Sequence, residues 1–225
     1  MEIITGIHQI KGIRGVNCYA VISESEILIV DTGMPGNAKK IIHYVQSIGR
    51  KPSEIKYILL THGDIDHTGS AAELKKLTGA KVGIHAGDAQ ILSGKIGFKP
   101  IKGPLGLLFK LMRPFLRFQA VNPDILLTNG MEIMGCQVIY TPGHSEGSIC
   151  LYQPGKVVFA GDALRSDSRG NPTLPSRRAS TDIQKALASL NLIASLDYDV
   201  LLVGHGAPVI GKAASKVRDL IVHAK

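Results

Sequence analysis

Four potential metal ligands stand within six residues of one another in the segment YILLTHGDIDHTGS, namely His62, Asp64, Asp66 and His67. An apolar run precedes them, which predicts that a strand ends at this turn. His62 and Asp64 are two positions apart, so in extended backbone their side chains can point to the same side. Asp66 and His67 stand at the start of the next predicted helix and should point elsewhere. Because imidazoles and carboxylates bind divalent metals, this turn could serve two metal ions.

Three further candidate ligands each follow an apolar, strand-like run and lie beside glycine: His144 in VIYTPGHSEGS, Asp162 in VVFAGD and His205 in VLLVGHG. Asp31 in LIVDTG is placed similarly, although its neighbours offer no second donor. In an α/β fold the carboxyl ends of neighbouring strands converge on one crevice, so ligands that are distant in sequence can meet. The adjacent glycines permit the sharp turns that this requires. Four imidazoles and three carboxylates would suit two divalent ions.

The elements that must position these residues alternate between β-branched runs and helical patterns, which favours a layered α/β architecture. We expect strands over residues 16–22, 27–30, 55–61, 81–85, 132–140, 148–153, 156–160 and 199–203, and helices over residues 37–48, 68–77, 182–196 and from 212 onward. Thr181 or Ser180 should cap the helix over residues 182–196. Two strand-rich halves, each backed by helices, predict a four-layer sandwich in one domain over residues 1–225.

Taken in order, the motifs THxxxDHxG, TPGHSxGS, GD and GHG resemble those of the metallo-β-lactamase superfamily of binuclear metallohydrolases, from about Val16 to Pro208. The resemblance implies the αβ/βα sandwich of that family, with two metal ions at the edge of its two sheets. It also implies a ligand set: His62, Asp64 and His144 for metal one, Asp66, His67 and His205 for metal two, and Asp162 as the bridge. Asp31 matches the family's aspartate that orients a ligand histidine without binding metal.

The reaction that the resemblance implies is hydrolysis. Two divalent ions, with zinc expected first, would share a bridging hydroxide and polarise a carbonyl or phosphoryl oxygen of the substrate. Asp66 would also touch the attacking water and could carry its proton to the leaving oxygen, which makes it the expected catalytic residue. No nucleophile from the protein is required.

The chain departs from the common family pattern HxHxDH at Asp64, where a histidine usually stands. With three carboxylates and one hydroxide, two divalent ions have a neutral ligand set, whereas a histidine at this position would leave one positive charge. The added oxygen donor favours iron or manganese over zinc at metal one. A similar acidic substitution, with glutamate, occurs in flavodiiron proteins, which reduce oxygen or nitric oxide.

A basic and apolar segment over about residues 93–123 does not fit the alternation of strands and helices. It contains six Lys and Arg residues, while no acidic residue stands between Asp88 and Asp124. We interpret it as an insertion or lid whose apolar side chains line an acyl-binding wall or a dimer contact and whose bases meet carboxylates or an anionic membrane surface. A pair of amphipathic helices with solvated bases is the simpler alternative. The expected lid residues are Leu107, Leu108, Leu111, Phe115 and Phe118.

Composition narrows the class of protein. A chain of 225 residues with 44% hydrophobic and 20% charged residues can build a full core, which excludes disordered, collagen-like and coiled-coil proteins. The net charge of +8 raises nucleic acid, membrane or acidic substrates as partners. The lid bases alternate with Phe and Leu, unlike a phosphate track, so we expect no nucleic acid. Cys18, Cys136 and Cys150 form no CxxC pair and should be buried thiols in a reducing, cytoplasmic compartment.

These observations predict a cytoplasmic binuclear metallohydrolase that acts on a small ester, lactone or thioester with an apolar portion. One alternative is a phosphodiesterase or nuclease-type hydrolase, which only the net charge supports. Another is a diiron protein that handles oxygen or electrons, prompted by Asp64. A binding module without catalysis is the third, but all seven ligand positions are retained.

Overall fold

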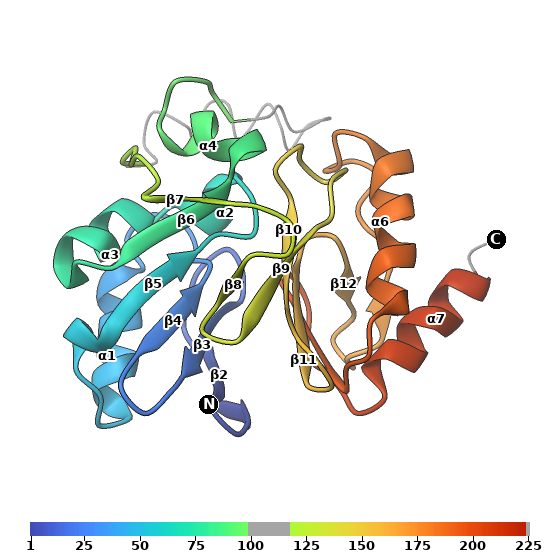
Figure 1. The fold of residues 1–225 in the computed structure, drawn as a ribbon, viewed down its shortest axis with the longest axis horizontal. Helices are drawn as coiled ribbons and strands as arrows, with labels where there is room; N and C mark the ends of the chain where they lie inside the picture. The colour runs from blue at the N-terminus through green and yellow to red at the C-terminus, as the bar shows by residue number, and fades with distance from the viewer. Residues whose placement is uncertain (99–117, 224–225) are drawn as a thin grey trace. The chain divides into compact units, whose positions relative to one another are not determined.

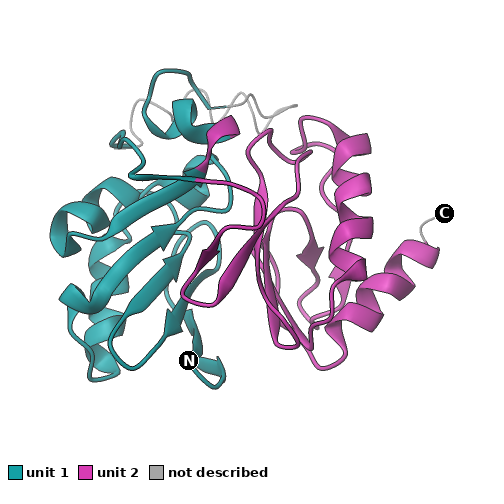
Figure 2. Ribbon diagram, viewed as in Figure 1, with its two compact units in different colours: residues 1–84, 88–126 teal, residues 85–87, 127–225 magenta. Residues whose placement is uncertain are grey.

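The computed structural model describes residues 1–98 and 118–223. Figure 2 shows two compact units, one of residues 1–84 with 88–126 and one of residues 85–87 with 127–225. Each unit holds one large sheet. The single domain over residues 1–225 stays a prediction. Among the described helices, none is long and apolar enough to cross a membrane.

The first unit is built on a seven-stranded sheet in the order β1-β2-β3-β4-β5-β6-β7. Strands β1 to β4 pair antiparallel, whereas β4, β5 and β6 run parallel. The strands are β1 Glu2–Ile4, β2 Ile7–Ile10, β3 Cys18–Ile22, β4 Ile27–Val30, β5 Ile55–Leu59, β6 Lys81–His85 and β7 Ile125–Leu127. The helices are α1 Ala38–Ser47, the 3-10 turn η1 Pro52–Glu54, α2 Ile65–Thr68, α3 Ala71–Thr78 and α4 Ala86–Leu92, whose residues 86–87 belong to the second unit.

The core of the first unit forms where α1 and α3 cover one face of the sheet (Figure 1). Ile41 of α1 and Leu74 of α3 are fully buried and belong to one cluster with Ile27 and Ile29 of β4. Ile27 and Ile29 share this face because side chains alternate along a strand. All four residues of β4, which pairs antiparallel with β3 and parallel with β5, are buried, so both faces of this strand are covered.

The second unit is built on a six-stranded sheet in the order β15-β14-β11-β10-β9-β8, with a separate hairpin of β12 and β13. Its neighbouring strands β11 and β14 run parallel. Leu190 of α6 and Val217 of α7 pack in one cluster with Val158 and Leu201 of these strands. The strands are β8 Glu132–Ile133, β9 Cys136–Tyr140, β10 Ile149–Gln153, β11 Val157–Gly161, β12 Arg165–Ser166, β13 Pro172–Thr173, β14 Val200–Val203 and β15 Val209–Ile210, and the helices are α6 Ile183–Ser195 and α7 Ala213–His223.

Three details of the helices differ from the sequence prediction, the first being that α4, Ala86–Leu92, was not predicted. The predicted helix over residues 68–77 is divided into α2 and α3 at Gly69. A β-carbon at Gly69 would lie 2.4 Å from Pro35 Cδ, so this close approach requires glycine. The predicted cap of α6 at Thr181 or Ser180 is wrong, because Asp182 is the cap. The Thr181 hydroxyl instead donates to backbone carbonyls in the loop that carries His144.

The lid prediction falls mostly on undescribed residues. Leu107, Leu108, Leu111 and Phe115 lie outside the described part of the chain. Phe118 is described, and its ring meets that of Phe98 edge to face at 4.8 Å. The three cysteines are buried and free, which confirms that part of the sequence interpretation.

The Asp182 cap predicts a measurable change in stability. Asp182 Oδ1 accepts hydrogen bonds from the Gln184 and Lys185 amides, each at 3.0 Å. Asp182→Ala removes the acceptor and should lower the free energy of unfolding by about 1 kcal/mol, measured by urea denaturation. Asp182→Asn keeps an acceptor and is the control. Equal loss in both variants would contradict the capping role.

Candidate metal centre

In the first unit, the candidate ligands lie at the carboxyl ends of two neighbouring parallel strands. Asp31 follows β4 directly, and Thr61 and His62 follow β5. Because β4 and β5 pair parallel, with Val30 opposite Leu59, their carboxyl ends share one edge of the sheet. The Asp31 amide continues this pairing by donating to the Leu59 carbonyl at 3.1 Å. The topology therefore places a buried aspartate beside the turn that carries four candidate ligands.

The Asp31 carboxylate connects the backbone and the side chains of this turn. Its Oδ1 accepts from the Thr61 amide at 2.8 Å, and its Oδ2 accepts from the Thr61 hydroxyl at 2.8 Å. Asp31 Oδ2 also lies 2.8 Å from His67 Nδ1. Asp31 is 2% exposed and has a φ of +59°, a left-handed conformation that aspartate tolerates better than most residues. The strained backbone aims the carboxylate at its partners.

These contacts fix which ring nitrogen of each histidine carries the proton. An ionised carboxylate only accepts, so His67 must donate its Nδ1–H to Asp31. The Thr61 hydroxyl already donates to Asp31, so it accepts from His62 Nδ1, 3.1 Å away. With Nδ1–H donating in each ring, the neutral tautomer has its lone pair on Nε2, the nitrogen that can bind a metal.

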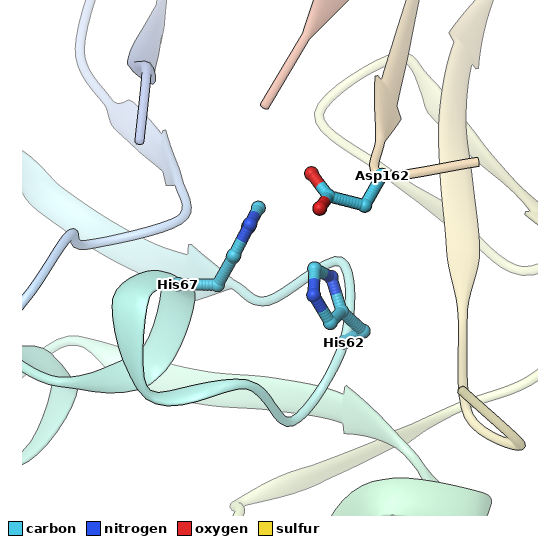
Figure 3. Close-up of side chains that lie close together, drawn as sticks. All are labelled: His62, His67 and Asp162. Carbon is cyan, nitrogen blue, oxygen red and sulfur yellow. The ribbon is translucent and has the colours of Figure 1, made fainter. Parts of the chain in front are cut away.

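The candidate donor atoms of the first unit lie close together. The rings of His62 and His67 have their centroids 3.9 Å apart. His62 Nε2 lies 3.4 Å from Asp64 Oδ2. Ligand atoms of Asp66 and His67 lie within 4.8 Å of each other. Figure 3 shows His62 extending from the turn after β5 and His67 from α2. Two imidazoles and two carboxylates therefore meet on one short stretch of chain.

The second unit holds the other three candidates. Asp162 follows β11 and His205 follows β14, and these strands are parallel neighbours. Asp162 Oδ2 lies 3.4 Å from His205 Nε2 and 3.7 Å from His144 Nε2. Figure 3 shows the Asp162 carboxylate at the end of β11. Because Asp162 lies near both imidazoles, its carboxylate could bridge two ions.

The loop that carries His144 is fastened to the start of α6. Asp182 donates its amide to the Gly143 carbonyl at 2.9 Å, and Thr181 donates its amide to the His144 carbonyl at 3.1 Å. A β-carbon at Gly143, whose φ is +129°, would lie 2.1 Å from the Ala186 amide nitrogen. Only glycine permits this approach, so the loop can lie directly on the helix.

Three residues that hold the ligand turns were missed by sequence reasoning. Thr61 links Asp31 to His62, as described above. The Thr32 amide and hydroxyl both donate to the His67 carbonyl, at 2.7 and 2.9 Å. Asp88 accepts a hydrogen bond from the Gly63 amide at 2.7 Å. Threonine and aspartate are common at turns, so the residue types alone did not indicate a supporting role. The one available indication was that the two threonines are adjacent in sequence to Asp31 and His62.

Comparison with known proteins identifies the family. The sequence profile described as the metallo-β-lactamase superfamily matches residues 12–205. The chain belongs to this superfamily. The resemblance noted from the motifs is therefore confirmed, and the match ends at His205, the last of the candidate ligands.

Relatives of this superfamily member cover most of its length. The probable metallo-hydrolase YflN of Bacillus subtilis is 29% identical, over 92% of this chain and 88% of its own. The hydroxyacylglutathione hydrolase GloC of Haemophilus influenzae is 26% identical, over 85% of each chain. A metallo-β-lactamase family protein of Thermus thermophilus has a solved structure that matches with a TM-score of 0.74 and 23% identity, over 99% of this chain and 80% of its own. This likeness confirms the predicted α/β metallo-β-lactamase fold.

The Asp31 contacts predict how metal affinity depends on this carboxylate. Asp31→Asn should weaken binding of divalent metal about 10- to 100-fold, because in either orientation the new amide group faces a donor from Thr61 or His67. Titration of metal-stripped protein against a chromophoric chelator measures the change. Asp199→Asn is the control, since the exposed Asp199 carboxylate accepts from the Lys212 amide, a contact that involves no proposed ligand turn. Unchanged affinity in Asp31→Asn would refute the orienting role.

Proposed function

We propose that this chain is a binuclear metal-dependent hydrolase. Superfamily membership supports metal-dependent hydrolysis, and the chemistry of the donors supports two ions. Metal one would be held by His62, Asp64 and His144, metal two by Asp66, His67 and His205, with Asp162 as the bridge. The observation that carries the proposal is the gathering of four imidazoles and three carboxylates in two clusters, one beside the carboxyl ends of the parallel strands β4 and β5 and one beside those of β11 and β14.

The donors fit divalent first-row metals. The hydrogen bonds of His62 and His67 use Nδ1 of each ring, so Nε2 is the nitrogen available for ligation. When bound, the two ions would lower the pKa of a water molecule and polarise the substrate. Asp66 would accept a proton from the attacking water and pass it to the leaving oxygen or sulfur. We propose zinc as the first metal to test.

For the substrate we propose a small ester, lactone or thioester with an apolar portion. The apolar side chains of residues 93–123 support the apolar portion, and the edge-to-face pair of Phe98 and Phe118 belongs to that segment. The relative named as a hydroxyacylglutathione hydrolase makes acylated thiols the first substrates to test.

Metal removal should abolish the proposed activity. Metal-loaded protein should hydrolyse at least one class in a parallel screen of esters, lactones, thioesters and phosphodiesters, and stripping with a chelator should reduce the rate to background. His62→Ala and Asp162→Ala should do the same, because each removes a proposed ligand, while circular dichroism shows retained folding.

The control variant is His43→Ala, since His43 is exposed on α1 and is no proposed ligand. It should keep the activity of the unmodified protein. Full activity after metal stripping would disprove the mechanism. Turnover of phosphodiesters alone would favour the phosphodiesterase alternative over the proposed substrate class.

The oxygen donor of Asp64 predicts a change in metal preference. Asp64→His replaces a carboxylate oxygen by an imidazole nitrogen and should raise the zinc content relative to iron and manganese. Metal analysis of protein produced with all three metals available measures the ratio. Asp64→Asn keeps an oxygen donor without the charge, so it should keep the original preference at lower affinity. Equal ratios in Asp64→His and the unmodified protein would contradict this role, and iron in both positions of the unmodified protein would favour the diiron alternative.

A further inference from the structure

Asp88 is a buried carboxylate that contacts the backbone between two proposed ligands. It is 1% exposed, and its Oδ2 accepts a hydrogen bond from the Gly63 amide at 2.7 Å. Gly63 separates His62 from Asp64. A hydrogen bond to an ionised acceptor is about twice as strong as one between neutral groups. The Asp88 carboxylate therefore restrains the direction in which both neighbouring side chains leave the turn.

Packing at Gly63 adds a second restraint on the same turn. A β-carbon at this position would lie 3.1 Å from Asp88 Cβ and 3.2 Å from Ile91 Cδ1. Any larger residue would have to push the turn away from α4. The amide of Gly63 reaches the Asp88 carboxylate because no side chain intervenes.

In the second unit, the residues just before Asp88 contact the loop that follows His144. The His85 ring stacks on the Tyr140 ring with centroids 4.4 Å apart and an interplanar angle of 18°. The Tyr140 hydroxyl donates to the Glu146 carbonyl at 2.9 Å. A β-carbon at Gly87 would lie 2.8 Å from the Gly147 amide nitrogen. Glu146 and Gly147 are the second and third residues after His144, so these contacts restrain the loop.

We propose that residues 85–88 act as a strap that positions the ligands of metal one. The proposal rests on the ligand assignment of the proposed function, in which His62, Asp64 and His144 hold that ion. Asp88 restrains the turn of the first two, and residues 85–87 restrain the loop of the third. Since Gly87 and Asp88 are consecutive, one short stretch of chain serves all three ligands. The strap residues are positioning residues, because they act through the backbone of the ligand turns.

The strap differs from Asp31 in the ions that it serves. Asp31 contacts His67 directly and His62 through Thr61, so it supports a ligand of each ion. The strap contacts described above fall on the turns of metal one. Changes to the strap should therefore weaken one of two bound ions, whereas a change to Asp31 should weaken both.

The test is a Zn²⁺ titration of the metal-stripped full chain in competition with a chromophoric chelator. Asp88→Ala should weaken one of the two binding steps about 10- to 100-fold and leave the other within about threefold. Tyr140→Phe removes only the hydroxyl and should weaken the same step by a smaller factor. Asp88→Asn keeps an acceptor for the Gly63 amide and should restore most of the affinity.

Two variants control for a general loss of stability. Asp124→Ala removes a carboxylate that accepts from the Val82 amide at 2.8 Å, and Tyr152→Phe removes a hydroxyl that donates to the Asp197 carbonyl at 3.0 Å. Neither contact involves a proposed ligand turn. Both variants should lower the melting temperature as the strap variants do, while both zinc affinities stay unchanged.

The outcomes separate the strap from the proposed function. Equal weakening of both steps in Asp88→Ala, or of neither, would overturn the strap. Absence of hydrolysis by the zinc-loaded unmodified protein would overturn the proposed function alone, and the strap would still be supported if Asp88→Ala lost one of two ions. The same selective loss in Asp124→Ala would also overturn the strap.

Discussion

The conformation of the turn that carries His62 and His67 depends on its hydrogen bonds to the buried carboxylate of Asp31. Removing a carboxylate from water costs several kcal/mol unless hydrogen bonds compensate for it. Here the donors come from Thr61 and His67, so the compensation requires that the turn after β5 lies against the end of β4. The parallel register of these strands meets that condition, and a slip by one residue would turn Asp31 to the other face of the sheet. The contacts that place the proton on Nδ1 of His62 and His67 therefore form only in this strand register.

The second unit uses the same principle with different residues. β11 and β14 are parallel neighbours; Asp162 directly follows the last residue of β11, and His205 is the second residue after β14. The turn that carries His205 is restrained by close packing and not by a supporting carboxylate. A β-carbon at Gly206 would lie 2.1 Å from the Ser166 carbonyl oxygen. In both units the sheet determines where the candidate ligands lie, and the turn after each strand determines the direction of their side chains.

The sequence predicted what is local and missed what depends on distant contacts. The strands over residues 27–30 and 81–85 have the bounds that their β-branched patterns indicated. The turn of candidate ligands could be proposed from the sequence because its four potential donors stand within six residues. Asp88 was not, since its partner Gly63 is 25 residues away and nothing in either residue type indicates that they meet. The cap of α6 was misplaced because Thr181 uses its hydroxyl for the loop that carries His144, which only the fold reveals.

The hydrogen bonds that hold the ligand turn must overcome repulsion between the carboxylates that the turn carries. Asp64 and Asp66 carry like charges on one short turn, with Asp31 and Asp88 on its flanks, and repulsion between carboxylates disfavours their approach in the absence of cations. Two divalent ions, bound as proposed, would remove that repulsion and would be the largest local charges. The hydrogen bonds to backbone amides at Thr61 and Gly63 keep the turn ordered without using the free energy of metal binding for that purpose. Aspartate at position 64, in place of the usual histidine, increases the repulsion, so this chain has greater need of such contacts than a turn with the common HxHxDH pattern.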